Sequence, residues 1–157
     1  MSPLRRRPLR TGGVVTVDAT PNSHPNNHPD SGAPSAYEAY TNAPDLRREM
    51  HGLLALGAER DGRQAVPATG PPADPTAAER AWLLRRAALM DRIAQGGDPG
   101  PAAAAAETAE QLVRHDRRHP GLVAGPVHPD AVTPTPGPRR YVRQEYAAWT
   151  AAGRPGT

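Results

Sequence analysis

The strongest pattern along the chain is an apolar stripe with helical spacing between residues 76 and 95. Charged and small residues fill the other positions, so a helix here has one face suited to burial. Thr76 and Glu79 match the Thr-x-x-Glu capping box, and the pair Gly96-Gly97 is a helix stop. The sequence therefore predicts a helix over 76–95, with an apolar stripe of Trp82, Leu83, Ala87, Leu89, Met90 and Ile93.

Two further helices are predicted over residues 101–119 and 139–152. The first opens on a proline and a run of alanines, which have the highest helix propensity. The short turn before it favours an antiparallel αα-hairpin with helix 76–95. We expect the apolar side of helix 139–152 to complete a three-helix core with Trp82. The residues that face this core are then Ala102, Ala105, Ala109, Leu112, Val113, Val142, Tyr146 and Trp149.

A separate helix is predicted over residues 44–58. Pro44 suits a first helical turn and Gly57 a helix end, while Gly52 weakens the middle by about 1 kcal/mol. A three-helix core leaves no place for the apolar face of this helix. We therefore expect that face to be exposed and to bind a partner protein or a second copy of the chain through Leu46, Met50, Leu53 and Leu54.

The predicted fold class is all-α: an αα-hairpin plus a C-terminal helix, one extra N-terminal helix and long disordered segments. High proline content and few apolar residues indicate disorder near the N-terminus and between the helices. Because the core has few large side chains, we expect marginal stability. The predicted divisions are a disordered arm (1–34), a single amphipathic helix region (35–60), a Pro/Gly-rich linker (61–75), a small helical domain (76–152) and a disordered tail (153–157).

The basic residues change this picture less than the isoelectric point of about 9.9 suggests. All 19 basic side chains are arginines, and lysine, phenylalanine and cysteine are absent, as a GC-rich coding sequence would produce. Residues 66–119 carry seven arginines and seven carboxylates, so the net charge of +3 comes from the chain ends. The absence of cysteine excludes disulfides, thiol catalysis and cysteine-based zinc sites.

Two histidine pairs have the spacing of metal ligands. His24 and His28 lie among prolines that prevent a helix, and arginines surround His115 and His119, which disfavours a bound cation. The dipole at a helix C-terminus accounts for the second pair without a ligand. The sequence also lacks a nucleophile elbow and a phosphate-binding glycine loop. We therefore predict no metal, no cofactor, no catalytic residue and no enzyme activity.

Arginine clusters support an alternative function, because guanidinium groups pair bidentately with phosphates. The clusters near the chain ends are the candidate nucleic-acid contacts. Interspersed carboxylates are equally typical of an ordinary salt-bridged surface, so this stays the second hypothesis. The candidate contacts are Arg5, Arg6, Arg7, Arg10, Arg139, Arg140 and Arg143.

Two segments resemble a group of small helical proteins of high-GC actinomycetes, some of them encoded near mobile elements. They are AERAWLLRRAALMDRIA (78–94) and YVRQEYAAW (141–149). The resemblance covers about residues 76–152 and implies that both segments belong to one helical unit. It implies no activity and no site residues. The first 65 residues lie outside it, which would also fit a translation start assigned too far upstream.

The leading functional hypothesis is a noncatalytic accessory or protein-interaction protein. The alternative is a nucleic-acid-binding accessory protein of a mobile element that uses the terminal arginine clusters. No apolar run reaches the 18 residues of a membrane span, so we expect no membrane contact and a cytoplasmic location.

Overall fold

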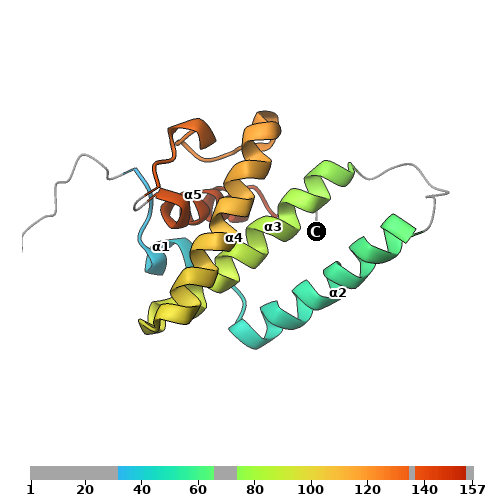
Figure 1. Ribbon diagram of the computed structural model, residues 1–157, viewed down its shortest axis with the longest axis horizontal. Helices are drawn as coiled ribbons and strands as arrows, with labels where there is room; N and C mark the ends of the chain where they lie inside the picture. Colours follow the sequence, from blue (N-terminus) through green and yellow to red (C-terminus); the bar gives the residue numbers. More distant parts are fainter. Residues whose placement is uncertain (1–31, 66–73, 135–136, 155–157) are drawn as a thin grey trace, which may run out of the picture.

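The described part of the chain is built from α-helices and short 3-10 turns. The computed structural model describes residues 32–65, 74–134 and 137–154, and no β-strand occurs among them. The predicted all-α class is confirmed (Figure 1). The helices are α1 (Ala36–Tyr40), α2 (Leu46–Ala65), α3 (Pro75–Ile93), α4 (Pro99–Arg118) and α5 (Gly137–Ala151), with 3-10 turns at Ala94–Gly96, Pro120–Leu122 and Pro129–Ala131.

The predicted αα-hairpin is formed by α3 and α4. After α3 and its 3-10 turn, Gly97 adopts a left-handed conformation with φ of 86°, which reverses the chain into α4. Helix α5 packs on both members of the hairpin and α1 packs on α5, whereas α2 packs on α3 (Figure 1). The buried core is made of Leu84, Ala87, Ala88, Ala109, Leu112, Val113, Tyr141, Val142, Tyr146 and Trp149.

The aromatic part of this core differs from the expectation in one member. Tyr146 and Trp149 pack together as predicted, with ring centroids 5.5 Å apart. Trp82 does not join them, because it lies on another side of α3, toward α2 and α4. Its place is taken by Tyr40 of α1, which meets Tyr146 edge to face at 5.3 Å.

The region 35–60 contains two helices, not the single one predicted. Ser35 and Glu38 form a full capping box at the start of α1, and the chain turns again before α2. Tyr40 and Ala43 both pack against the core. The folded unit therefore includes residues well before 76, where the predicted domain began.

Helix α2 runs past its predicted end at residue 58 as far as Ala65, so the first five residues of the predicted linker are helical. Gly57 does not end the helix: it lies against Trp82, whose Nε1 is 3.7 Å from the position of a Cβ added there. Helix α3 starts with Asp74 as its cap, since the Asp74 carboxylate accepts from the Thr76 N–H at 2.9 Å. The predicted Thr76–Glu79 capping box is wrong, because Pro75 already provides the first helical residue.

The predicted disordered segments fall largely outside the described residues, which exclude 1–31, 66–73 and 155–157. The first two residues of the predicted tail are ordered. Arg154 donates to the Asn42 carbonyl oxygen at 2.9 Å, and its guanidinium carbon lies 5.8 Å from the centroid of the Trp149 ring. This contact ties the end of α5 to the segment between α1 and α2.

Replacing Gly57 with alanine is expected to raise the free energy of unfolding by about 0.5–1 kcal/mol. The added Cβ makes an ordinary van der Waals contact with Trp82, and alanine has a higher helix propensity than glycine. Gly52→Ala is the matched control, since its Cβ would lie 2.9 Å from Nη2 of Arg85. Urea unfolding should show stabilisation for Gly57→Ala only, and equal gains at both positions would contradict the close packing of Gly52.

Candidate functional site

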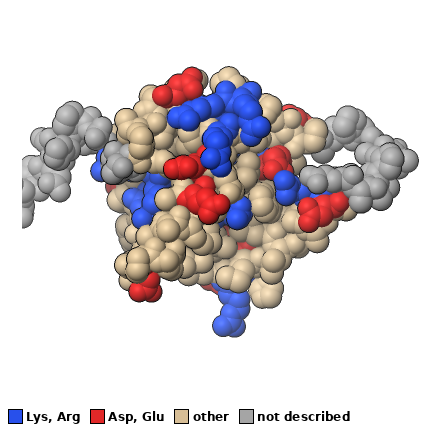
Figure 2. Space-filling view, in the orientation of Figure 1, with Lys and Arg blue, Asp and Glu red and all other residues tan. Residues whose placement is uncertain are grey.

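A groove of about 740 Å³ lies between α2, α3 and α4, and its lining is strongly basic. Glu79 is the one acidic residue among the described residues that line it. Basic side chains gather over the C-terminal half of α4, as Figure 2 shows in blue. The arginines of the lining are Arg60, Arg86, Arg114 and Arg118.

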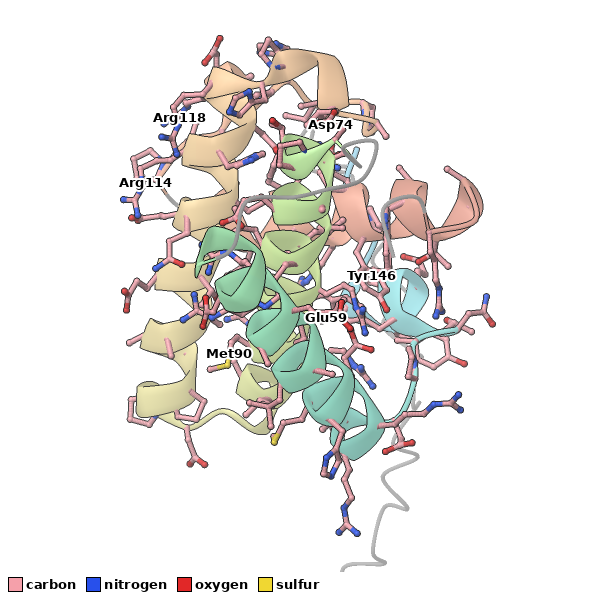
Figure 3. The ribbon with its side chains drawn as sticks, turned by 90° about the vertical axis from the view of Figure 1, so that its right-hand side faces the viewer. Glu59, Asp74, Met90, Arg114, Arg118 and Tyr146 are labelled. Atoms are coloured by element: carbon pink, nitrogen blue, oxygen red, sulfur yellow. The ribbon has the colours of Figure 1, made fainter. Side chains whose placement is uncertain are left out.

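Helical spacing brings these side chains to the same opening. Gln111, Arg114, His115 and Arg118 follow one another at i, i+3, i+4 and i+7, which places them on one face of α4. Figure 3 shows Arg114 and Arg118 projecting from the same side of that helix. The helical spacing of these residues can be recognised in the sequence. It was not treated as a basic face because segment 66–119 as a whole has no net charge.

Trp82 forms the floor of the groove between two arginines. The guanidinium carbons of Arg60 and Arg86 lie 4.8 and 5.4 Å from the centroid of its ring, within the range of a cation–π interaction. Arg60 also donates from Nε and Nη2 to the carboxylate of Glu79, and Arg86 donates from Nη1 to Gln111 at 2.7 Å. Both arginines are therefore held in defined positions. The Trp82 Nε1 is buried without an acceptor and faces α2 at Gly57.

His115 and His119 lie side by side at this end of α4. No group of three or more His, Cys, Asp or Glu able to hold a metal ion occurs in residues 32–65, 74–134 and 137–154. His115 is buried, with its ring 4.7 Å from that of His119 and its Nδ1 3.4 Å from the Asp116 carboxylate. Burial lowers the pKa of His115, so the imidazole is neutral at pH 7.

Beneath the groove, Arg80 joins two carboxylates inside the fold. It donates to both oxygens of Asp116, at 2.8 and 2.9 Å, and to Glu145 at 2.7 Å. Tyr141 donates its hydroxyl to Asp116 at 2.8 Å. Asp116 and Glu145 are both 0% exposed. This cluster connects α3, α4 and α5, and sequence reasoning missed it entirely.

Glu145 also fixes the loop that follows α4. Its carboxylate accepts from the backbone N–H groups of Ala124 and Gly125, at 3.0 and 2.9 Å. A side chain at Gly125 would collide with that carboxylate, so glycine permits the close approach. Buried charge is thus used here to hold the fold together, not to face a ligand.

Another buried carboxylate, Asp91, binds two arginines that were predicted to contact nucleic acid. Arg143 donates to Asp91 from Nε at 2.8 Å and from Nη2 at 3.2 Å, and Arg139 also donates to it. Tyr40 donates its hydroxyl at 2.9 Å. Arg139 and Arg143 are therefore engaged with a buried carboxylate in this fold, and their contact with phosphates stays a prediction. Arg140 is exposed, and Arg5, Arg6, Arg7 and Arg10 lie outside the described residues.

The outer side of α2 carries three of the four apolar residues predicted to bind a partner. Leu46, Met50 and Leu54 are 40%, 46% and 68% exposed. Leu53 is only 9% exposed and turns inward toward the rest of the fold, so its prediction as part of the exposed face is wrong. Glu49 lies on the same inner side, and its carboxylate accepts a hydrogen bond from Nε of Arg85 of α3 at 2.7 Å. Helix α2 is therefore firmly attached along one side and open along the other.

Comparison with protein-family models, with curated proteins and with solved structures gave no match. Among the described helices, none is long and apolar enough to cross a membrane. Two surface features are therefore the candidates for a functional role: the basic groove and the open side of α2.

Proposed function

We propose that this protein is a noncatalytic interaction protein that pairs with a second copy of itself through the open side of α2. The observation that carries the proposal is an exposed apolar stripe on a helix that is otherwise anchored by Glu49 and Leu53. A noncatalytic role is supported by the buried carboxylates Asp91, Asp116 and Glu145, because each is engaged by arginine inside the fold.

Charge placement along α2 favours a second copy as the occupant of this stripe. Leu54 lies seven residues from both Arg47 and Asp61, so all three share one face of the helix. Arg47 makes no ion pair within the described part of the chain, and Asp61 has only a 4.0 Å contact with Arg60. If two copies of α2 pair antiparallel about Leu54, Arg47 of each copy lies opposite Asp61 of the other. This two-fold arrangement satisfies both charges and brings the Leu54 side chains together.

A single pair of helices buries less area than the ~1,000 Å² of a stable interface, so we expect a weak dimer. Sedimentation equilibrium at concentrations up to about 1 mM should detect it. Leu54→Asp should weaken dimerisation at least about tenfold, since it places unpaired carboxylates at the centre of the interface. Leu54 is the test position because it is exposed, whereas a charge at buried Leu53 would damage the fold.

Charge exchange tests the antiparallel orientation. Arg47→Asp or Asp61→Arg alone should weaken the dimer by placing like charges opposite each other. The double variant, Arg47→Asp with Asp61→Arg, should restore it. Tyr37→Ser is the control, because Tyr37 is also exposed, at 82%, but belongs to α1. A monomer at every concentration would overturn the proposal, and a double variant without recovery would overturn the orientation.

A further inference from the structure

We infer that the groove between α2, α3 and α4 is a binding site for the phosphate groups of a polyanion. This inference concerns a different surface from the open side of α2 and stands independently of the proposed dimer. It rests on the placement of four arginines, on the way two of them are held, and on the exposure of the other two.

The charges that line the groove are mostly positive. Among the described residues that line it, four are arginines and only Glu79 carries a carboxylate, which is already bound by Arg60. Arg114 has only a 4.0 Å contact with Glu110, and more than half of each of these side chains is exposed. The groove therefore keeps an excess of positive charge that its own acidic lining does not neutralise. An anionic ligand would reduce the repulsion among these guanidinium groups.

Two of the groove arginines are held in position before any ligand binds. Stacking against Trp82 and the bonds to Glu79 and Gln111 hold Arg60 and Arg86 in position without a ligand. Arg118 is directed along α4 by donating from Nε to the Arg114 carbonyl oxygen at 3.2 Å. Side chains that are ordered before binding lose less conformational entropy when a ligand arrives.

The spacing of Arg114 and Arg118 favours phosphate over carboxylate as the bound anion. Arg114 and Arg118 are one helical turn apart, with Cβ atoms separated by about 5–6 Å. A phosphate group has more acceptor oxygens than a carboxylate, so one phosphate can bridge both guanidinium groups. The Trp82 ring is already contacted by two arginines, which leaves less of its face for a stacked base. We therefore expect contact through phosphates, whether they belong to a nucleic-acid backbone or to a free polyphosphate.

The test uses the full chain and two probes. Fluorescence anisotropy measures binding of a labelled single-stranded oligothymidylate, and the ¹⁵N–¹H indole signal of Trp82 measures binding of inorganic tripolyphosphate. Tripolyphosphate should shift the Trp82 signal and leave that of Trp149, which is buried in the core, in place. Binding of both probes identifies phosphate in general, and binding of tripolyphosphate alone identifies a small ligand as the source.

The key variant is Arg114→Gln with Arg118→Gln. We expect it to weaken binding about 100-fold, or about tenfold per lost charge-assisted contact. With the oligonucleotide, the slope of log K against log salt should fall by about 1.4, which corresponds to two phosphate contacts on a single strand. Arg48→Gln is the control, because it removes an exposed arginine outside the groove.

Three results would overturn the inference. The first is an equal loss of binding in Arg48→Gln and in the groove variant, which would indicate a general charge effect. The second is an unmoved Trp82 signal with tripolyphosphate together with no oligonucleotide binding. The third is equally tight binding of polyglutamate, measured by the same Trp82 signal, which would assign the groove to acidic protein segments.

Discussion

Replacing Arg80 with alanine is expected to lower the free energy of unfolding by about 3–5 kcal/mol, the range for a buried ion pair that loses one partner. The variant leaves Asp116 and Glu145 without their shared counter-charge, and both are 0% exposed. Because the free energy of unfolding of small domains is roughly 5–15 kcal/mol in total, this variant would lose a large fraction of it. Urea unfolding followed by far-UV circular dichroism measures the change.

The expected loss of stability depends on which groups of the cluster are charged, namely Arg80 and its two carboxylates, while Tyr141 is neutral. Burial acts to lower the pKa of Arg80, but its bonds to Asp116 and Glu145 outweigh burial and raise the pKa overall. Burial and the neighbouring Asp116 carboxylate both raise the pKa of Tyr141, so its hydroxyl stays a donor. Removal of Arg80 therefore deletes a permanent positive charge, and Tyr141 cannot replace it.

Two controls separate this effect from the loss of any arginine. Arg80→Lys keeps the charge but cannot donate to both oxygens of Asp116 in a planar fork, so we expect an intermediate loss. Arg114→Ala removes an arginine whose side chain is 59% exposed, and surface substitutions of this kind change stability by about 0.5 kcal/mol or less. Equal stability in Arg80→Ala and Arg114→Ala would show that the buried cluster adds nothing.

The elements that could be predicted from the sequence are those determined by residues close together in the chain. Glycine pairs, prolines and alanine runs determine where helices start and stop, and they sufficed for the α3–α4 hairpin. The apolar spacing of α5 likewise identified Tyr146 and Trp149 as core residues. Local signals were also available for α1, whose Ser35-x-x-Glu38 capping box was overlooked.

The face that α3 buries could not be predicted from apolar spacing, because charged residues occupy part of it. Arg80 and Asp91 are buried together with Leu84, and all three share the core side of the helix. A reading of hydrophobic residues alone treats such charges as solvent-facing and so places Trp82 in the core. The partners of Arg80 lie 36 and 65 residues away in the sequence, so no local pattern records the pairing.

The basic groove was hidden for a related reason. Residues 66–119 are neutral by count, which argued against a phosphate site on the folded part. Two of the seven carboxylates in this segment, Asp91 and Asp116, are buried with arginines of α3 or α5. Arg139 and Arg143, which neutralise Asp91, come from outside the segment, so Asp91 does not offset the charge of the segment's own surface arginines. The charge of a surface therefore depends on which charges are buried, and a count along the chain does not give it.

Asp91→Asn is expected to lower the free energy of unfolding at pH 7 by about 2–3 kcal/mol, the range for lost hydrogen bonds to a charged group. The substitution keeps the shape of the side chain but removes the charge that holds α1 and α5 on α3. The effect is smaller than for Arg80→Ala because the side chains of Arg139 and Arg143 are 29% and 18% exposed and can turn toward water. Urea unfolding of both proteins at pH 7 measures the difference.

The pH dependence of this difference tests its cause. Burial acts to raise the pKa of Asp91, but the bonds from Arg143 and Arg139 outweigh it and hold the pKa below the ordinary 3.8. A carboxylate with a lowered folded pKa stabilises fully above its unfolded pKa and loses that contribution as the pH falls through the folded value. The stability gap between wild type and Asp91→Asn should therefore stay constant while the pH is well above 3.8 and narrow as the pH falls below that value. A gap that stays unchanged to the lowest pH would mean that packing of the side chain, not its charge, joins these helices.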